Sequence, residues 1–146
     1  MLVGDGANPI ICGNSVHDGR SLGVQFSGLE TKGRFERNNV ERNAGAGLEV
    51  CDGASPTVTL NLFHDGQDAG VLIDDATVLI THNKIYGNSA ANVVFRGAST
   101  SGRLTFNAVY GGSQHGVYIE DGASPLVDSN MIYANKEVAW GGVAFS

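Results

Sequence analysis

The sequence predicts an all-β protein: a right-handed parallel β-helix, or solenoid, of about six rungs of 22–24 residues with both ends open. An asparagine recurs at intervals of 22–24 residues, and apolar residues hold fixed places around it. No stretch keeps a 3.6-residue apolar period long enough for a helix. A fixed period in this range is typical of repeats that stack on one another.

The recurring asparagines define the rungs. They are Asn14, Asn38, Asn61, Asn83, Asn107 and Asn130. In a parallel β-helix, equivalent residues of successive rungs lie above one another, roughly 4.8 Å apart. We therefore expect these side chains to form a ladder at an inward-facing turn, with amides that hydrogen-bond between rungs. A buried amide without partners would cost about 1–3 kcal/mol, so the stacking is what makes the column tolerable.

Apolar columns accompany the ladder. The residues three positions before each asparagine are Ile11, Phe35, Val58, Ile80, Leu104 and Val127, and those two positions after it are Val16, Val40, Phe63, Ile85, Val109 and Ile132. A third strand of each rung carries the pairs Val24 and Phe26, Leu48 and Val50, Val71 and Ile73, Val93 and Phe95, Val117 and Ile119, and Val143 and Phe145. A spacing of two residues points both side chains of a strand to one face, so these columns are the expected core.

A turn motif separates the third strand from the next one. Asp5-Gly6-Ala7-Asn8-Pro9 recurs, with serine for asparagine, at residues 52–56 and 121–125. Asp-Gly followed by proline is typical of a turn that leads into an extended strand. Near the C-terminus, the glycine signature predicts that a new rung begins at Gly142.

Composition limits the classes of partner. The net charge is −6, and residues 47–146 hold ten acidic and four basic side chains. An acidic body argues against nucleic acid and anionic membrane as partners, and no apolar run approaches the ~20 residues of a membrane span. The N-terminal residues lack the features of a signal peptide. We expect one domain over residues 1–146, a fragment of a longer solenoid, and an intracellular (cytoplasmic or nuclear) location if the chain is complete.

The candidate binding residues form one outward column, three positions after each ladder asparagine. They are His17, Glu41, His64, Tyr86, Tyr110 and Tyr133. The two histidines are two rungs apart, roughly 9–10 Å, and outward side chains run parallel to one another. We therefore predict no metal site, no cofactor and no catalytic residue, and we expect a surface ladder with modest cross-strand stabilisation.

Other polar residues have simpler interpretations. A second outward column, Ser27, Cys51, Asp74, Arg96 and Glu120, is expected to include a surface ion-pair ladder. Cys12 and Cys51 lie on different faces two rungs apart, so no disulfide is expected. His82 and His115 are expected to lie alone and solvated near turns.

The rungs resemble a known family. Residues 14–19 and 61–66 follow the pattern Asn-x-apolar-His-Asp-Gly, whereas residues 38–43, 83–88 and 130–135 follow Asn-x-apolar-x-x-Asn. This alternation resembles the carbohydrate-binding and sugar-hydrolase (CASH) type of right-handed β-helix, and is most similar to the β-helix segment of the F-box only protein 11 family. The resemblance implies substrate recognition for a ubiquitin ligase.

Two function classes remain open. The first is a non-catalytic repeat scaffold that recognises a protein partner, since solenoids present extended surfaces. The alternative is a carbohydrate-binding or polysaccharide-processing β-helix, lyase-like or epimerase-like, with a groove lined by Tyr86, Tyr110 and Tyr133 for sugar stacking. A lyase would need a base and cations to stabilise the developing charge, and the spacing of the residues supplies no such cluster.

Overall fold

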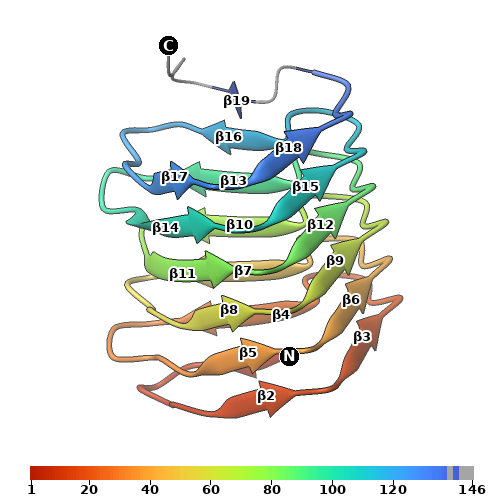
Figure 1. The fold of residues 1–146 in the computed structure, drawn as a ribbon. Helices are drawn as coiled ribbons and strands as arrows, with labels where there is room; N and C mark the ends of the chain where they lie inside the picture. Colours follow the sequence, from red (N-terminus) through yellow and green to blue (C-terminus); the bar gives the residue numbers. More distant parts are fainter. Residues whose placement is uncertain (138–139, 142–146) are drawn as a thin grey trace.

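The computed structural model describes residues 1–137 and 140–141, and it confirms the predicted architecture. The chain winds into a stack of rungs, and three parallel sheets run along the stack (Figure 1). We call them sheets A, B and C, and we name each corner by the sheets that it joins. Each rung contributes one strand to every sheet, in the order A, B, C.

The strands are short and pair in parallel with the equivalent strand of the next rung. Sheet A contains β1 Leu2–Val3, β4 Val24–Ser27, β7 Leu48–Cys51, β10 Val71–Asp74, β13 Val93–Arg96, β16 Val117–Ile119 and β19 Trp140–Gly141. Sheet B contains β2 Ile10–Cys12, β5 Arg34–Glu36, β8 Thr57–Thr59, β11 Thr77–Thr81, β14 Ser101–Thr105 and β17 Leu126–Asp128. Sheet C contains β3 Ser15–His17, β6 Asn39–Glu41, β9 Leu62–His64, β12 Lys84–Tyr86, β15 Ala108–Tyr110 and β18 Met131–Tyr133.

The predicted apolar columns fill the space between the three sheets. Their members in the middle rungs are fully buried, and Phe26, Phe35 and Phe63 are among the largest side chains inside. The rings of Phe26 and Phe35 meet edge to face at 6.4 Å, and those of Phe35 and Phe63 lie 6.1 Å apart. Such a core stabilises the fold by removing apolar area from water, at about 25 cal/mol per Å².

The B–C corner bends the chain with a single residue in each rung. That residue directly precedes the ladder asparagine and has a left-handed φ of 53–71°; the column is Gly13, Arg37, Leu60, His82, Phe106 and Ser129. A side chain in this conformation costs roughly 1–2 kcal/mol. The bend places the following asparagine inside the stack, where hydrogen bonds offset that cost.

The asparagine ladder is confirmed, and it has a direction. The Asn61 Oδ1 accepts hydrogen bonds from the backbone N of Asn38 at 2.9 Å and from its Nδ2 at 3.1 Å. The Asn61 Nδ2 in turn donates to the Phe35 carbonyl at 2.8 Å and to the Asn83 Oδ1 at 3.0 Å. In the described part of the chain, every buried side-chain nitrogen or oxygen has a hydrogen-bond partner.

The last strand begins earlier than the glycine signature predicts. Trp140 pairs with Val117 in sheet A, so the expectation of a rung starting at Gly142 is wrong. In every rung the strand of sheet A begins five positions after the residue that occupies the C–A corner, here Asn135, and this constant spacing determines the register. The predicted core residues Val143 and Phe145 lie outside the described residues.

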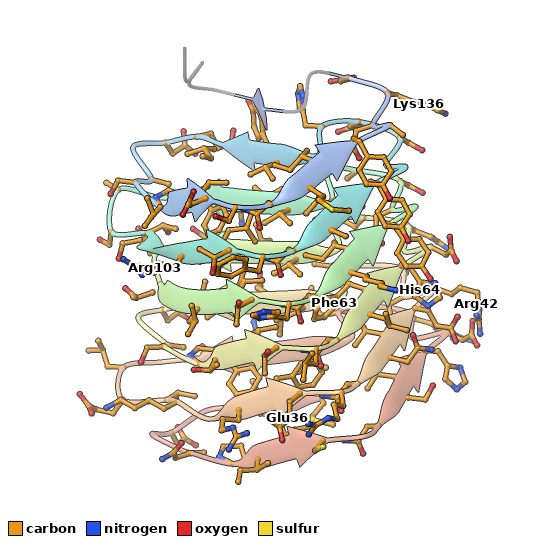
Figure 2. All side chains as sticks on the ribbon, viewed as in Figure 1. Glu36, Arg42, Phe63, His64, Arg103 and Lys136 are labelled. Atoms are coloured by element: carbon orange, nitrogen blue, oxygen red, sulfur yellow. The ribbon has the colours of Figure 1, made fainter. Side chains whose placement is uncertain are left out.

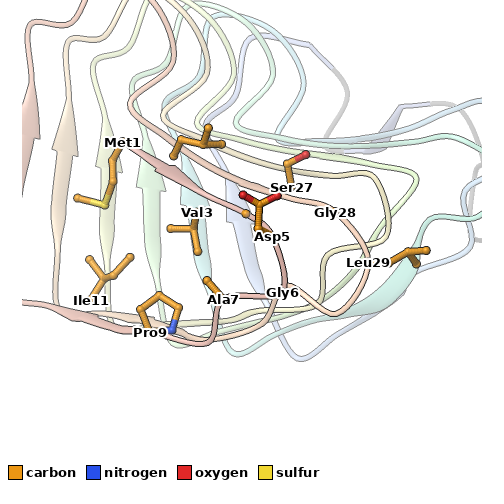
Figure 3. A pocket seen from close by; sticks show the side chains of 12 residues that line it. Met1, Val3, Asp5, Gly6, Ala7, Pro9, Ile11, Ser27, Gly28 and Leu29 are labelled. Atoms are coloured by element: carbon orange, nitrogen blue, oxygen red, sulfur yellow. The ribbon is translucent and has the colours of Figure 1, made fainter.

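The N-terminal end of the stack leaves the core partly uncovered. Ile11 and Val16 are only half-buried, whereas their equivalents in the middle rungs are fully buried. A hollow of about 800 Å³ lies at this end, lined by residues that include Met1, Val3 and Leu29 (Figure 3). The first copy of the Asp-Gly turn motif, residues 5–9, lies at this end and leads into β2.

Candidate functional site

The predicted outward column exists as a continuous row on the outer face of sheet C. The strand register pairs its members in sequence: His17 with Glu41, Glu41 with His64, His64 with Tyr86, Tyr86 with Tyr110, and Tyr110 with Tyr133. All of them end their strands, just before the C–A corner. The row divides into an aromatic half and a charged half.

The aromatic half, which we call the aromatic ladder, consists of His64, Tyr86, Tyr110 and Tyr133. Neighbouring ring centroids lie 4.8, 5.0 and 5.0 Å apart, and the planes are inclined by only 3°, 5° and 9°. Figure 2 shows the rings stacked above His64 along one edge of the solenoid. Burial raises the pKa of the Tyr86 hydroxyl, and the neighbouring Tyr110 adds to that shift.

This stacking decides which parts of the rings can contact a ligand. The parallel strands are about 4.8 Å apart, close to the separation of the rings, so each inner ring has a neighbour against both of its faces. The ring edges and the tyrosine hydroxyls point outward. The aromatic ladder therefore presents a narrow strip of edges and hydroxyl groups over four successive rungs.

The charged half is an ion-pair network around Arg42. Its guanidinium contacts Asp18 at 2.9 and 3.1 Å and also binds Glu41. The hydrogen bond from Arg42, with a further one from His17, lowers the pKa of Asp18 to about 2. Asp18 in turn raises the pKa of Arg42. Asp18 and Arg42 are about half-exposed, whereas the Glu41 side chain is only 17% exposed, and one guanidinium pairs with both carboxylates.

His64 joins the two halves of the column. Its Nδ1 lies 2.8 Å from Asp65, and its Nε2 lies 2.9 Å from the Oδ1 of Asn39. The Nδ2 of Asn39 donates to Glu41 at 3.2 Å, which fixes the orientation of that amide. The Tyr86 ring stacks on it at 4.8 Å, so this side chain, 12% exposed, is held from three sides.

Rungs that end in glycine at the C–A corner pack against rungs that end in asparagine there. One column there alternates strictly between glycine and asparagine: Gly19, Asn43, Gly66, Asn88, Gly112 and Asn135. The Asn88 Oδ1 accepts from the backbone N of Gly66 at 3.0 Å, and a Cβ on Gly66 would lie 3.1 Å from that oxygen. The glycine of the His-Asp-Gly motif therefore makes room for the asparagine of the following rung.

Asn92 replaces glycine in the neighbouring column of the same corner. It is fully buried, accepts from the Nδ2 of Asn88 at 2.8 Å, and donates to the Oδ1 of Asn135 at 2.9 Å. Sequence reasoning singled out the repeated asparagines but not this second buried network. The alternation of the two rung patterns was the signal that could have revealed it.

The outer face of sheet A carries the second predicted column. Arg96 pairs with Asp74 at 2.8 Å, but among the described residues Glu120 lies in no ion pair, so the expected ladder is confirmed only for its first pair. Sequence reasoning also missed a groove of about 390 Å³ beside this column, between sheet A and the C–A corner. Alanines at residues 69, 90 and 91 leave this space unfilled.

The two isolated histidines are not alone, contrary to expectation. The His82 ring stacks on Phe106 at 5.4 Å, and the His115 ring stacks on Tyr118 at 5.0 Å. His115 also contacts Glu137 at 3.1 Å. Phe106 and Glu137 each lie one rung along the stack from their histidine, whereas Tyr118 follows His115 by three residues in the same rung.

The described residues contain no group of three or more metal-ligating side chains. Cys12 and Cys51 are both free thiols, as predicted. Burial raises the pKa of the Cys51 thiol, which keeps it in the less reactive protonated form. In the same part of the chain, no helix has the length and apolarity needed to cross a membrane.

Comparison with known families agrees with this geometry. The right-handed beta helix region family matches residues 1–100 and again residues 74–146, which together span the chain. No curated protein and no solved structure matches. The family match, the three parallel sheets and the asparagine ladder agree with one another, and the chain belongs to the right-handed β-helix family.

Proposed function

We propose that the chain is a non-catalytic scaffold that recognises a protein partner through the aromatic ladder. The observation that carries this proposal is the stacking of His64, Tyr86, Tyr110 and Tyr133 at 4.8–5.0 Å. It produces a strip of ring edges and hydroxyls held rigid by the strands beneath. Tyrosine is enriched at protein interfaces because it combines apolar area with a hydrogen-bonding group.

Rigidity favours this use of the strip. Each ring is fixed by its neighbours before any partner arrives, so little side-chain entropy is lost on binding. The network around Arg42 continues the same column with charged groups, which can add specificity at the edge of an interface. Extended surfaces of this kind are the usual binding surfaces of solenoid proteins.

The same geometry argues against sugar stacking on the inner rings, Tyr86 and Tyr110. A sugar packs on the open face of an aromatic ring, whereas Tyr86 has His64 at 4.8 Å on one side and Tyr110 at 5.0 Å on the other. Carbohydrate binding is therefore the alternative function that the crosslinking experiment must distinguish from protein binding.

The class of partner rests on the resemblance of the rungs. The alternation of His-Asp-Gly rungs with Asn-x-x-Asn rungs is similar to that of the F-box only protein 11 β-helix. On that ground we propose that the partner is a protein recognised for ubiquitin ligation.

Site-specific photocrosslinking tests the proposal. A photoreactive residue at Lys84, exposed on β12 beside the ladder, should join the chain to one partner in a cell lysate. The control carries the same residue at Arg103, exposed on the outer face of sheet B. The product from Lys84 should disappear when Tyr86 and Tyr110 are replaced by alanine in a variant whose circular dichroism is unchanged.

Two results would overturn the proposal. One is the same crosslinked product from both positions, or a product from Lys84 that survives the loss of the tyrosines. The other is no product at all together with glycan-array binding that the two alanine substitutions abolish, which would establish the carbohydrate reading.

A further inference from the structure

The groove on sheet A is a second surface, separate from the aromatic ladder. Its floor is formed by Leu72, Val94 and Tyr118, which occupy one outward column of β10, β13 and β16. One wall is formed by the C–A corner, where the small side chains of Ala69, Ala90 and Ala91 lie. The volume of about 390 Å³ falls within the range of binding pockets.

The floor of the groove is apolar and half-exposed. Leu72, Val94 and Tyr118 point outward from sheet A, yet the wall shields them in part from water. The Tyr118 ring is held by its stacking on His115 at 5.0 Å. A rigid apolar floor of this kind suits the side chains of an extended chain segment, whose alternate residues point in the same direction.

The charges around the floor are mostly negative. Asp68 and Glu120 line the groove, and in the part of the chain that the structure describes neither of them is in an ion pair. Arg96 is the one arginine or lysine among the lining residues, and Asp74 holds it at 2.8 and 2.9 Å. Glu49 lies beside Leu72 on the neighbouring strand β7, so it adds a carboxylate at the next position of the column that forms the floor. The groove thus offers carboxylates without matching cations.

We propose that this groove binds an extended segment of a partner protein in which apolar side chains alternate with lysine or arginine. The apolar side chains would pack on Leu72 and Val94. The intervening basic side chains start from the opposite face of the segment, and their long stems would bend back over its edges to reach Asp68 and Glu120 at the rim. Opposite charges across such a surface accelerate encounter and select the partner. The proposal does not rest on the aromatic ladder, because the groove lies on the other side of the C–A corner.

A peptide-binding measurement tests the proposal. The probe is a fluorescein-labelled heptapeptide in which lysine alternates with valine and leucine, and its control has glutamate in place of lysine. Fluorescence anisotropy should show binding of the basic peptide only, with an affinity that falls as salt is raised. The double variant Asp68→Asn with Glu120→Gln should bind about tenfold more weakly.

Matched variants separate the groove from the general charge of the protein. Asp121→Asn with Asp128→Asn also removes two negative charges, but these residues lie at the A–B corner and on sheet B, so the affinity should stay unchanged. Arg96→Gln should tighten binding. Ala90→Leu fills the groove without altering its charge and should abolish binding. Replacing Tyr86 and Tyr110 by alanine should leave peptide binding intact.

The proposal fails if both double variants weaken binding equally, because the attraction would then be general. It also fails if the acidic peptide binds as well as the basic one, or if Ala90→Leu has no effect. Displacement of the bound peptide by an oligosaccharide would assign the groove to a different class of ligand. None of these results bears on the photocrosslinking test of the aromatic ladder.

Discussion

At the scale of single residues, a buried ladder asparagine serves four partner groups at once. The Asn61 side chain accepts from the backbone N and the Nδ2 of Asn38, and it donates to the Phe35 carbonyl and to the Asn83 Oδ1. These groups are buried, so water cannot replace a missing partner. The asparagine is therefore a structural residue in every rung, and its exact amide geometry matters more than its size.

Asn61→Leu should lower the free energy of unfolding by about 3 kcal/mol or more, because it leaves buried donors without an acceptor. Chemical denaturation checks this value. Asn8→Leu is the matched control: Asn8 is exposed in the A–B corner, and its replacement should change stability by less than about 0.5 kcal/mol. Equal effects of the two substitutions would contradict the role assigned to the ladder.

The ion pair of Asp18 with Arg42 predicts a dependence of stability on pH. Because folding lowers the pKa of Asp18 from 3.8 to about 2, the pair stabilises the fold above about pH 4, and this contribution is lost as the pH falls toward 2. Asp18→Asn should therefore melt at a lower temperature than the parent chain at pH 6. At pH 2 the two melting temperatures should converge, and a constant difference would refute the assignment.

At the scale of strands and corners, close packing depends on glycine only at certain positions. A Cβ on Gly70 would lie 2.7 Å from the Ile85 Cγ2 and 2.8 Å from the Asn92 carbonyl oxygen. Gly4 is different, because the nearest atom to its Cβ would be the Ser27 carbonyl oxygen at 3.5 Å, an ordinary contact. Neither glycine has a positive φ, so the difference expected between them comes from what the next rung places beside each.

Gly70→Ala should therefore destabilise the protein by about 1–3 kcal/mol through overpacking, whereas Gly4→Ala should be close to neutral. Thermal unfolding of the two variants, followed by circular dichroism, measures the difference. A similar loss in both would contradict the clash predicted at Gly70.

At the scale of the whole molecule, the stack could be predicted because its signals are local and repeated. The fixed offsets of Ile80 and Ile85 from Asn83 identify the core faces of two strands in every rung, without knowledge of any distant contact. The row from His17 to Tyr133 follows from the same offsets. Its division into a stacked half and an ion-paired half does not, because it depends on ring orientation and rotamers.

Features that depend on contacts between two rungs, or between a sheet and a corner, could not be predicted from residue offsets within one rung. The groove on sheet A arises because Ala90 and Ala91 are small next to Leu72 and Val94, and the residues of its floor and its wall lie in different parts of each rung. The last strand begins at Trp140, which pairs with Val117. Two signals in the sequence conflict over its start: the glycine at position 142 indicates a later start, and the five-residue spacing from the C–A corner indicates Trp140. The groove and the register of the last strand both depend on how one rung packs against its neighbour.

The fit of glycine against asparagine at the C–A corner has a consequence for the length of this solenoid. In this chain every rung with asparagine at that corner lies next to rungs with glycine, and the Asn43 Oδ1 accepts from the backbone N of Gly19 as the Asn88 Oδ1 does from that of Gly66. Deleting one internal rung would place two glycine corners or two asparagine corners side by side, so that a backbone N–H would lose its acceptor or a Cβ would meet the asparagine oxygen. The alternation thus has a parity: internal rungs can be added or removed in pairs without disturbing it.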